Sequence, residues 1–158
     1  MARITENTNI CAFLDMLAWS EIGTAILSNS DDGYNVLVGS TPSNILTFDD
    51  YSTHPNILNA KTNSTAAGRY QLLHRYFEPY ATLLGLPDFS PESQDKIAVQ
   101  QIKERKAYPL VIVGQLEQAI ERCSNIWASL PGNSYGQHAN SLDDLQNAYE
   151  NAGGEVAS

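Results

Sequence analysis

The sequence predicts an α+β protein in which helices dominate. Apolar residues recur at helical spacing near the start of the chain and over its second half, whereas residues 23–53 are rich in β-branched and small residues broken by turn signals. A chain of 158 residues with 42% hydrophobic and 17% charged residues is long and apolar enough for one folded domain. We therefore expect a single domain over residues 1–158 with an N-terminal helix-and-sheet lobe (about 9–60), a helical lobe (about 61–154) and a cleft between them.

The first helix is expected over residues 9–20. Three polar residues that can cap a helix, at positions 7–9, precede apolar residues at helical spacing: Ile10, Phe13, Leu14 and Leu17. The following segment favours a small antiparallel sheet, with residues 34–38 as one strand and residues 45–48 as its partner.

Four further helices are expected in the second half of the chain. One presents Leu72, Leu73, Tyr76, Phe77 and Tyr80 on one face, with Pro79 starting a new turn. The next begins at Ser90-Pro91, a cap followed by proline at the first helical position. A third carries Leu116, Ile120, Cys123 and Trp127 and ends at Pro131-Gly132, and the last runs from a Ser141 cap to a stop at Gly153-Gly154.

The charge of the chain restricts its partners. The formal net charge is -9 and the pI about 4.6, so nucleic acid and anionic membrane surfaces are disfavoured as partners. Residues 61–106 form the basic part, with seven bases against five acids. We expect no signal peptide, no stable membrane insertion and synthesis in the cytoplasm, with Cys11 and Cys123 as reduced thiols.

Glu21 is the candidate reacting group. It follows an apolar helical run that includes Trp19, where partial desolvation and the negative end of the helix dipole both disfavour the ionised carboxylate. A carboxyl group with its pKa raised in this way can donate a proton to a glycosidic oxygen near neutral pH. The alternative is a solvated residue at a helix end.

Seven blocks of the sequence carry a family resemblance. In this order they resemble the endolysins of lambdoid phages: Phe13–Glu21, Gly33–Gly39, Asp50–Pro55, Ala67–Leu73, Phe89–Asp95, Gln100–Arg105 and Cys123–Gly132. The resemblance extends over nearly the whole chain. It implies a lysozyme-like fold and a phage enzyme that cleaves peptidoglycan between N-acetylmuramic acid and N-acetylglucosamine as a lytic transglycosylase, for host cell lysis.

The resemblance also implies roles for individual residues. Glu21 would protonate the leaving oxygen and then deprotonate the muramoyl C6 hydroxyl, which closes a 1,6-anhydro ring. Ser20, Tyr70, Gln71 and Tyr135 are the candidate substrate-binding residues; Gly68–Gln71 matches a Gly-x-x-Gln motif of lysozyme-like transglycosylases. We expect no metal and no cofactor. The partner would be peptidoglycan glycan strands, met by a monomer that stays in the host cytoplasm until a separate holin releases it to the periplasm.

Other functions remain open at this point. Asp31 and Asp32 follow Glu21 at a spacing similar to that of an acidic residue in the T-even phage lysozymes, which hydrolyse, and the resemblance implies a candidate second carboxylate. Asp32-Gly33 is also typical of a turn. A non-catalytic glycan-binding protein with the same fold is the remaining alternative. Among the candidate substrate-binding residues, Tyr70 can instead be a core residue, Gln71 a residue at the start of a helix and Tyr135 an ordinary surface tyrosine.

Overall fold

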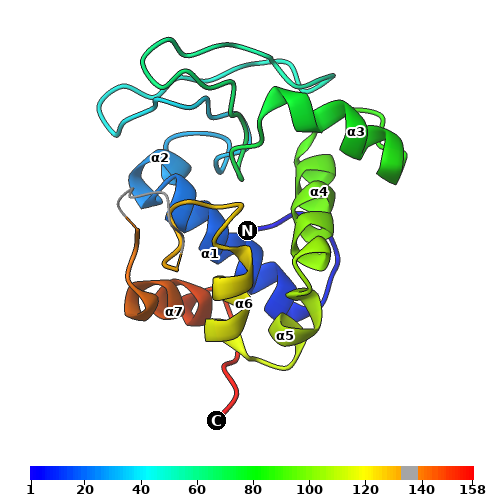
Figure 1. Ribbon diagram of the computed structural model, residues 1–158. Coiled ribbons are helices and arrows are strands. Elements are labelled where there is room, and N and C mark those ends of the chain that lie inside the picture. Colours follow the sequence, from blue (N-terminus) through cyan, green and yellow to red (C-terminus); the bar gives the residue numbers. More distant parts are fainter. Residues whose placement is uncertain (133–138) are drawn as a thin grey trace. The chain divides into compact units, whose positions relative to one another are not determined.

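The computed structural model describes residues 1–132 and 139–158. Its helices (Figure 1) are α1 (Thr8–Glu21), α2 (Thr24–Ser28), α3 (His74–Leu84), α4 (Pro91–Glu104), α5 (Tyr108–Ile112), α6 (Leu116–Cys123) and α7 (Leu142–Asn151). The described part of the chain is therefore mainly helical, as the sequence predicted.

The chain divides into two compact units. The first combines Met1–Glu21 with Ala98–Ser158, and the second is Ile22–Ile97. Each predicted lobe, about 9–60 and 61–154, is one continuous segment, whereas the first unit combines the N-terminal and C-terminal parts of the chain. The reason is that α1 packs against α5 and α7, so the N-terminal helix buries its apolar residues among C-terminal helices.

Helix α1 forms the centre of the first unit. Its side chains Ile10, Phe13, Leu14 and Leu17, the four that predicted the helix, are all fully buried. Asn7 caps the helix, because its Oδ1 accepts hydrogen bonds from the backbone N–H groups of Asn9 (2.9 Å) and Ile10 (3.4 Å). The helix ends at Glu21, two residues before Gly23, whose φ of 91° interrupts the helical backbone. The apolar helix thus carries one carboxyl group at its C-terminal end.

Two predicted helix starts are confirmed, and one predicted helix end is wrong. Helix α4 begins at Pro91, and α7 begins after Ser141, whose side chain accepts a hydrogen bond from the Asp144 backbone N–H. Helix α6 ends at Cys123 rather than at Pro131-Gly132. Trp127 and Leu130 lie beyond it in successive turns and are still buried. The helix-like spacing of apolar residues continues beyond α6 into these turns, which is why the sequence predicted a longer helix.

The predicted antiparallel sheet does not form, but the two segments predicted as its strands do pair with each other. Residues 22–97 contain only isolated antiparallel bridges, of which Val36 with Thr47 joins the two segments predicted as strands. The Leu37 N–H donates to Leu46 O at 2.8 Å. Positive φ angles at Gly33 and Gly39, on either side of this pairing, turn the backbone away before a longer ladder forms.

The second unit has its own aromatic core. Phe48, Phe77 and Phe89 pack together, with ring centroids 6.2 Å apart for Phe48 and Phe89 and 5.3 Å apart for Phe77 and Phe89. Helix α3 contributes Phe77 as its buried side chain and contains Pro79 within the helix. The aromatic cluster fixes α3 and the start of α4 to the loops of this unit.

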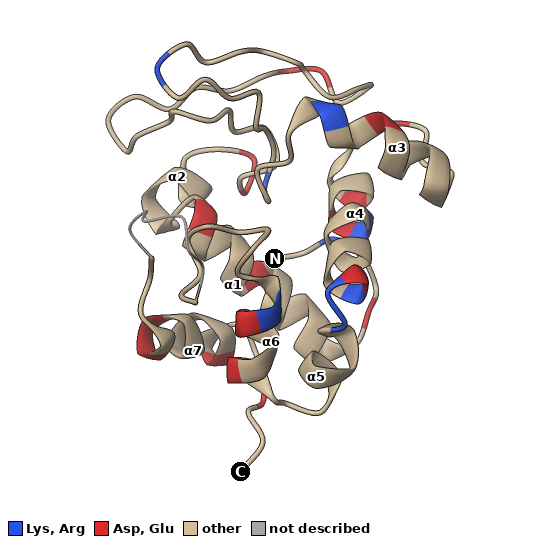
Figure 2. Ribbon diagram, in the orientation of Figure 1, with Lys and Arg blue, Asp and Glu red and all other residues tan. Residues whose placement is uncertain are grey.

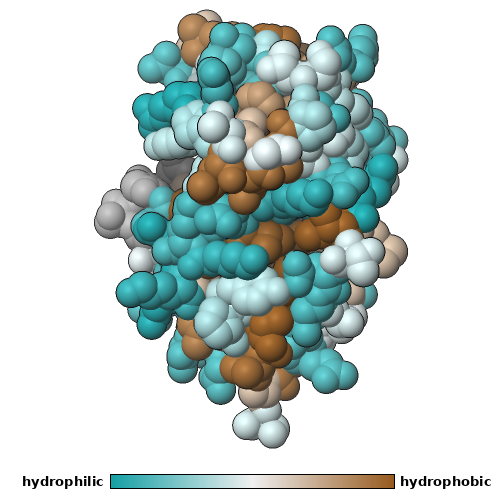
Figure 3. Space-filling view, turned by 90° about the vertical axis from the view of Figure 1, so that its right-hand side faces the viewer, coloured by the Kyte–Doolittle hydropathy of each residue, from teal (hydrophilic) through white to brown (hydrophobic). Residues whose placement is uncertain are grey.

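The surface is mixed in both charge and hydropathy. Figure 2 shows bases and acids interleaved along α4, where Lys96 forms an ion pair with Glu92 at 3.2 Å. On the face drawn in Figure 3, apolar residues form separate patches among hydrophilic ones. Within residues 1–132 and 139–158, no helix is long and apolar enough to cross a membrane.

Candidate active site

The Glu21 carboxyl group has the electrostatic property that the sequence predicted. Glu21 is the last residue of α1 and is partly exposed. Burial by its surroundings raises the pKa of this carboxyl from 4.5 to about 7, and a hydrogen bond with the Ser129 side chain opposes the rise. A carboxyl with this pKa is present in both its acid and its base form near neutral pH, which suits a group that gives and then takes a proton.

Ser20 connects the end of α1 to the segment that follows α6. The Ser20 and Ser129 hydroxyl oxygens lie 2.7 Å apart. The Asn140 side-chain amide donates to Ser20 Oγ at 2.9 Å and to Ser20 O at 3.3 Å, while its backbone N–H donates to Ser129 O at 2.8 Å. Ser20, Glu21, Ser129 and Asn140 therefore form one connected polar group within the first unit.

Ser129 and Asn140 were not among the sequence candidates. Ser20 and Ser129 are 109 positions apart, and Ser20 and Asn140 are 120 apart. Serine and asparagine are common in turns, so neither residue type stands out in the sequence. The predicted residue Tyr135 lies outside the described residues.

Tyr70 and Gln71 belong to the second unit. Tyr70 is 5% exposed, and its hydroxyl donates to Asp95 Oδ1 at 2.6 Å and accepts from Arg69 Nη1 at 2.9 Å. The Gln71 side-chain nitrogen donates to Gly68 O at 2.8 Å and to Val36 O at 3.3 Å. Within the described residues, the Gln71 side-chain nitrogen and the Tyr70 hydroxyl are therefore both engaged in contacts of the protein itself.

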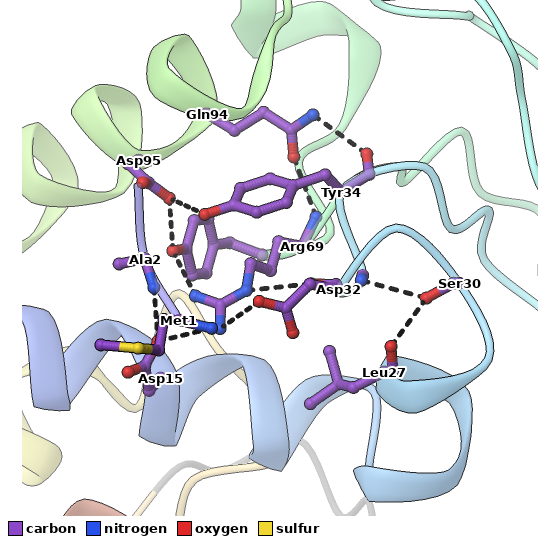
Figure 4. Close-up of polar contacts among 12 residues, drawn as sticks. Met1, Ala2, Asp15, Leu27, Ser30, Asp32, Tyr34, Arg69, Gln94 and Asp95 are labelled. Atoms are coloured by element: carbon purple, nitrogen blue, oxygen red, sulfur yellow. Dashed lines mark hydrogen bonds and ion pairs between the residues drawn. The ribbon is translucent and has the colours of Figure 1, made fainter. Parts of the chain in front are cut away.

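Arg69 is the centre of a buried network in the second unit (Figure 4). Its side chain is 2% exposed; Nε donates to Asp32 O at 3.0 Å, and Nη2 lies 3.5 Å from Asp32 Oδ2. The Tyr34 hydroxyl donates to Asp95 Oδ1 at 2.9 Å. The motif glycine Gly68 belongs to the same packing, because a Cβ there would lie 2.4 Å from Gln94 Oε1. The Gly68–Gln71 motif is thus held in shape by buried polar contacts.

Asp31 and Asp32 are both used in contacts within the second unit. Tyr51 donates its hydroxyl hydrogen to Asp31 Oδ2, and Asp32 pairs with Arg69. Asp32 has a φ of 49°, in the left-handed region that aspartate tolerates in turns. Among residues 1–132 and 139–158, no group of three or more His, Cys, Asp or Glu residues is placed to hold a metal ion.

Comparison with known proteins assigns the family. A family model described as Endolysin matches residues 11–156. The chain is 53% identical to the endolysin of Escherichia phage lambda over 150 residues, covering 92% of this chain and 91% of that protein. It is 46% identical to the endolysin of Escherichia phage P2 over 166 residues, covering 99% and 100%.

Solved structures agree with the sequence matches. The structure of bacteriophage lambda lysozyme complexed with a chitohexasaccharide is 49% identical, with a TM-score of 0.85, and the match covers 98% of this chain and 100% of that one. A second lambda lysozyme structure gives a TM-score of 0.83 with the same coverage. The chain therefore has the lambda lysozyme fold and belongs to the endolysin family, the phage enzymes that degrade peptidoglycan in host cell lysis.

Proposed function

We propose that this endolysin is a lytic transglycosylase that cleaves the β-1,4 bond between N-acetylmuramic acid and N-acetylglucosamine and leaves 1,6-anhydromuramoyl ends. The observation that carries the proposal is the Glu21 carboxyl, whose pKa burial raises to about 7. One group of this kind can act as the general acid of the first step and as the general base of the second.

In the first step protonated Glu21 gives its proton to the glycosidic oxygen as the bond to C1 breaks. The leaving chain departs with a hydroxyl group, and the muramoyl residue passes through an oxocarbenium ion or an oxazolinium ion formed by its own acetamido group. In the second step ionised Glu21 takes the proton from the muramoyl C6 hydroxyl as its oxygen attacks C1. Glu21 is then protonated again, and no water is consumed.

An intramolecular nucleophile explains why one carboxylate suffices. The C6 hydroxyl belongs to the sugar that is attacked, so it has the high effective concentration of an intramolecular reaction, worth about 7–11 kcal/mol at the favourable extreme. A hydrolase ordinarily uses a second carboxylate as nucleophile or to activate water. The use of Asp31 by Tyr51 and of Asp32 by Arg69 supports the transglycosylase over the hydrolase.

The relatives support the proposed substrate class, and Gln71 is compatible with it. The related lambda lysozyme was solved in complex with a chitohexasaccharide, which supports a β-1,4-linked amino-sugar chain as the ligand here. The Gln71 amide, held by two backbone carbonyls, is our candidate for binding a polar group of the sugar. As a proposal for the setting, the monomeric enzyme is made in the host cytoplasm and reaches peptidoglycan after a separate holin opens the inner membrane.

Replacement of Glu21 tests the assignment. Glu21→Gln keeps the shape of the side chain but removes the acid, so we expect the rate of clearing of purified peptidoglycan to fall by about 10²–10⁴-fold. Glu117→Gln is the matched control, since Glu117 is an exposed glutamate in the first turn of α6. Clearing at the wild-type rate by Glu21→Gln would show that Glu21 is not the reacting group.

A further inference from the structure

Gln94, near the start of α4, is bonded through its side chain to three backbone groups of the second unit. Its Oε1 accepts from the Arg69 N–H at 2.9 Å, and its Nε2 donates to Tyr34 O at 3.0 Å (Figure 4). The same nitrogen donates to Phe89 O at 2.9 Å. A backbone N–H can only donate and a carbonyl oxygen can only accept, so the three partners fix the orientation of the Gln94 amide. The side chain is 3% exposed, and the bonds are made away from solvent.

The bond from Arg69 fixes the peptide group between Gly68 and Arg69. The N–H of this group faces Gln94 Oε1. Its carbonyl oxygen, Gly68 O, accepts from the Gln71 side-chain nitrogen at 2.8 Å and from the Gln71 backbone N–H at 3.2 Å. The N–H and C=O of a planar trans peptide group point in opposite directions. Gln94 and Gln71 therefore hold the same peptide group from its two sides.

Gly68 gives this peptide group freedom to rotate. Glycine has no Cβ and adopts more backbone conformations than any other residue, and Gly68 lies in the left-handed region with a φ of 87°. A Cβ at position 68 would lie 2.4 Å from Gln94 Oε1, so the Gln94 side chain occupies the space beside the glycine. Rotation of the 68–69 peptide group away from Gln94 would also turn Gly68 O away from the Gln71 amide.

Gln71 depends on the shape of this turn. Its φ of 53° lies in the left-handed region, which is uncommon for a residue other than glycine. The backbone groups of Ala67 and Leu72 pair at 3.0 and 2.9 Å and close the turn around it. Of the two acceptors of the Gln71 side-chain nitrogen, Gly68 O is nearer, at 2.8 Å against 3.3 Å for Val36 O. The orientation of the Gln71 amide therefore follows that of the Gly68 carbonyl.

We propose that Gln94 is a positioning residue for glycan binding. It fixes the peptide group between Gly68 and Arg69, and the carbonyl of that group holds the Gln71 amide in the orientation that meets the sugar. This inference rests on the proposed role of Gln71 as a contact of a β-1,4-linked amino-sugar chain. Gln94 does not touch the glycan in this scheme, so its whole effect on binding passes through Gln71.

Gln94→Met tests the proposal in the full-length chain. Methionine is unbranched and similar in length to glutamine, but it cannot replace the three hydrogen bonds. We expect the dissociation constant for a chitohexasaccharide, measured by isothermal titration calorimetry, to rise about tenfold, which corresponds to one lost hydrogen bond. Gln94→Glu keeps an oxygen for the Arg69 N–H, so the rise should be smaller. An unchanged dissociation constant in folded Gln94→Met would overturn the proposal.

Combination with Gln71→Ala separates positioning from a direct contact. If Gln94 acts through Gln71, the double variant Gln71→Ala, Gln94→Met should bind the chitohexasaccharide no more weakly than Gln71→Ala alone. Losses that multiply in the double variant would refute the proposal. Wild-type affinity in Gln71→Ala would refute it as well, because Gln94 would then have no glycan contact to position.

The Gln71 side chain can also be followed without ligand. In ¹H–¹⁵N NMR spectra of the free protein, the side-chain NH₂ signals of Gln71 should shift in Gln94→Met and exchange faster with solvent, because the bond to Gly68 O is weakened. Unchanged Gln71 signals in that variant would show that Gln94 does not control the Gln71 amide.

Ser93→Ala is the matched control for stability. Ser93 precedes Gln94 in α4, is 4% exposed and donates its hydroxyl hydrogen to Asp88 Oδ1 at 2.7 Å. Urea unfolding should show a loss of stability in Ser93→Ala, whereas its affinity for the chitohexasaccharide and its Gln71 signals should match those of the wild type. An affinity that falls with stability in both Ser93→Ala and Gln94→Met would mean that Gln94 only stabilises the fold.

The binding measurements do not require turnover, so this inference and the proposed function fail separately. If Glu21→Gln clears peptidoglycan normally, the proposed reaction fails whatever the binding data show. If Glu21→Gln is inactive while Gln94→Met binds the chitohexasaccharide as tightly as the wild type, the reacting group is correct and the positioning role of Gln94 is wrong.

Discussion

The Tyr51 hydroxyl donates a hydrogen bond to Asp31 Oδ2 at 2.5 Å, across 20 positions of the chain. Its neighbour Asp32 adopts a φ of 49° and pairs with the buried Arg69. The two carboxylates that fit a hydrolase by their spacing from Glu21 are thus engaged in holding the turn 31–34 to the rest of the second unit.

The first prediction concerns this turn. Asp31→Asn and Asp32→Asn should each cleave peptidoglycan within about threefold of the wild-type rate, because the proposed transglycosylase reaction uses neither carboxylate. Asn tolerates the left-handed backbone of position 32, but it loses the ion pair with Arg69, so Asp32→Asn should lower the free energy of unfolding by about 1 kcal/mol. Rates are measured by turbidity and stability by urea unfolding. A rate loss of about 10²-fold or more in either folded variant would favour the hydrolase.

The second prediction is that the ionised carboxyl group of Glu21 lowers the free energy of unfolding. Because burial raises the pKa of Glu21 from 4.5 to about 7, the unfolded chain ionises first as the pH rises, and the folded state loses stability between these two values. Glu21→Gln should therefore be more stable than the wild type at pH 8, by about 1–3 kcal/mol, and the gain should be smaller at pH 5. Glu117→Gln should show no such gain. Equal stability of Glu21→Gln and wild type at pH 8 would contradict the raised pKa.

The third prediction concerns Tyr70. Its hydroxyl links Arg69 to Asp95, which is fully buried, and Tyr70→Phe leaves both with one partner fewer. We expect the free energy of unfolding to fall by about 1–3 kcal/mol and the apparent KM for peptidoglycan to stay unchanged. Tyr76→Phe, at a 44% exposed tyrosine of α3, is the control and should change neither quantity. A higher KM with unchanged stability would instead give Tyr70 the substrate-binding role.

The fourth prediction concerns the buried imidazole of His54. Its Nε2 lies 2.7 Å from Leu72 O, and Nδ1 accepts from the Asn56 backbone N–H at 3.1 Å, so the ring is held neutral. Burial lowers the pKa of His54 below 6.5. The unfolded chain therefore binds the proton first, and stability falls as the pH drops below about 6.5. His54→Phe should flatten this acid slope in urea unfolding between pH 7 and pH 5. His74→Gln should weaken the slope only in part, because the charge of the neighbouring His74 is a smaller cause of the lowered His54 pKa than burial. An unchanged slope in His54→Phe would contradict the assignment.

Much of the fold could be predicted from local signals. Apolar spacing at Ile10, Phe13, Leu14 and Leu17 identifies α1 because one long helix buries that whole face. Helix α7 could be predicted at both ends, from the Ser141 cap and the glycines after it. Glu21 could be singled out as a candidate because it ends an apolar helical run, which is a local pattern, although its burial and its bond with Ser129 come from distant parts of the chain.

Short elements could not be predicted in the same way. Helix α2 has five residues and lies where a sheet was expected; its nearest signals are Ser28 and Asn29, whose side chains bond back to carbonyls within it. Helix α5 was missed, although Pro109 in its first turn is a typical helix start. Contacts such as Ser20 with Ser129 form only after the two ends of the chain pack together, and no local pattern encodes them.

The central claim is that Glu21 transfers protons to and from the sugar without activating water. Its most direct test is mass spectrometry of the products released from purified peptidoglycan in H₂¹⁸O. The account predicts 1,6-anhydromuramoyl ends with no ¹⁸O incorporated, formed by the wild type and not by Glu21→Gln. Reducing muramic acid ends that carry ¹⁸O at C1 would show hydrolysis and contradict the account.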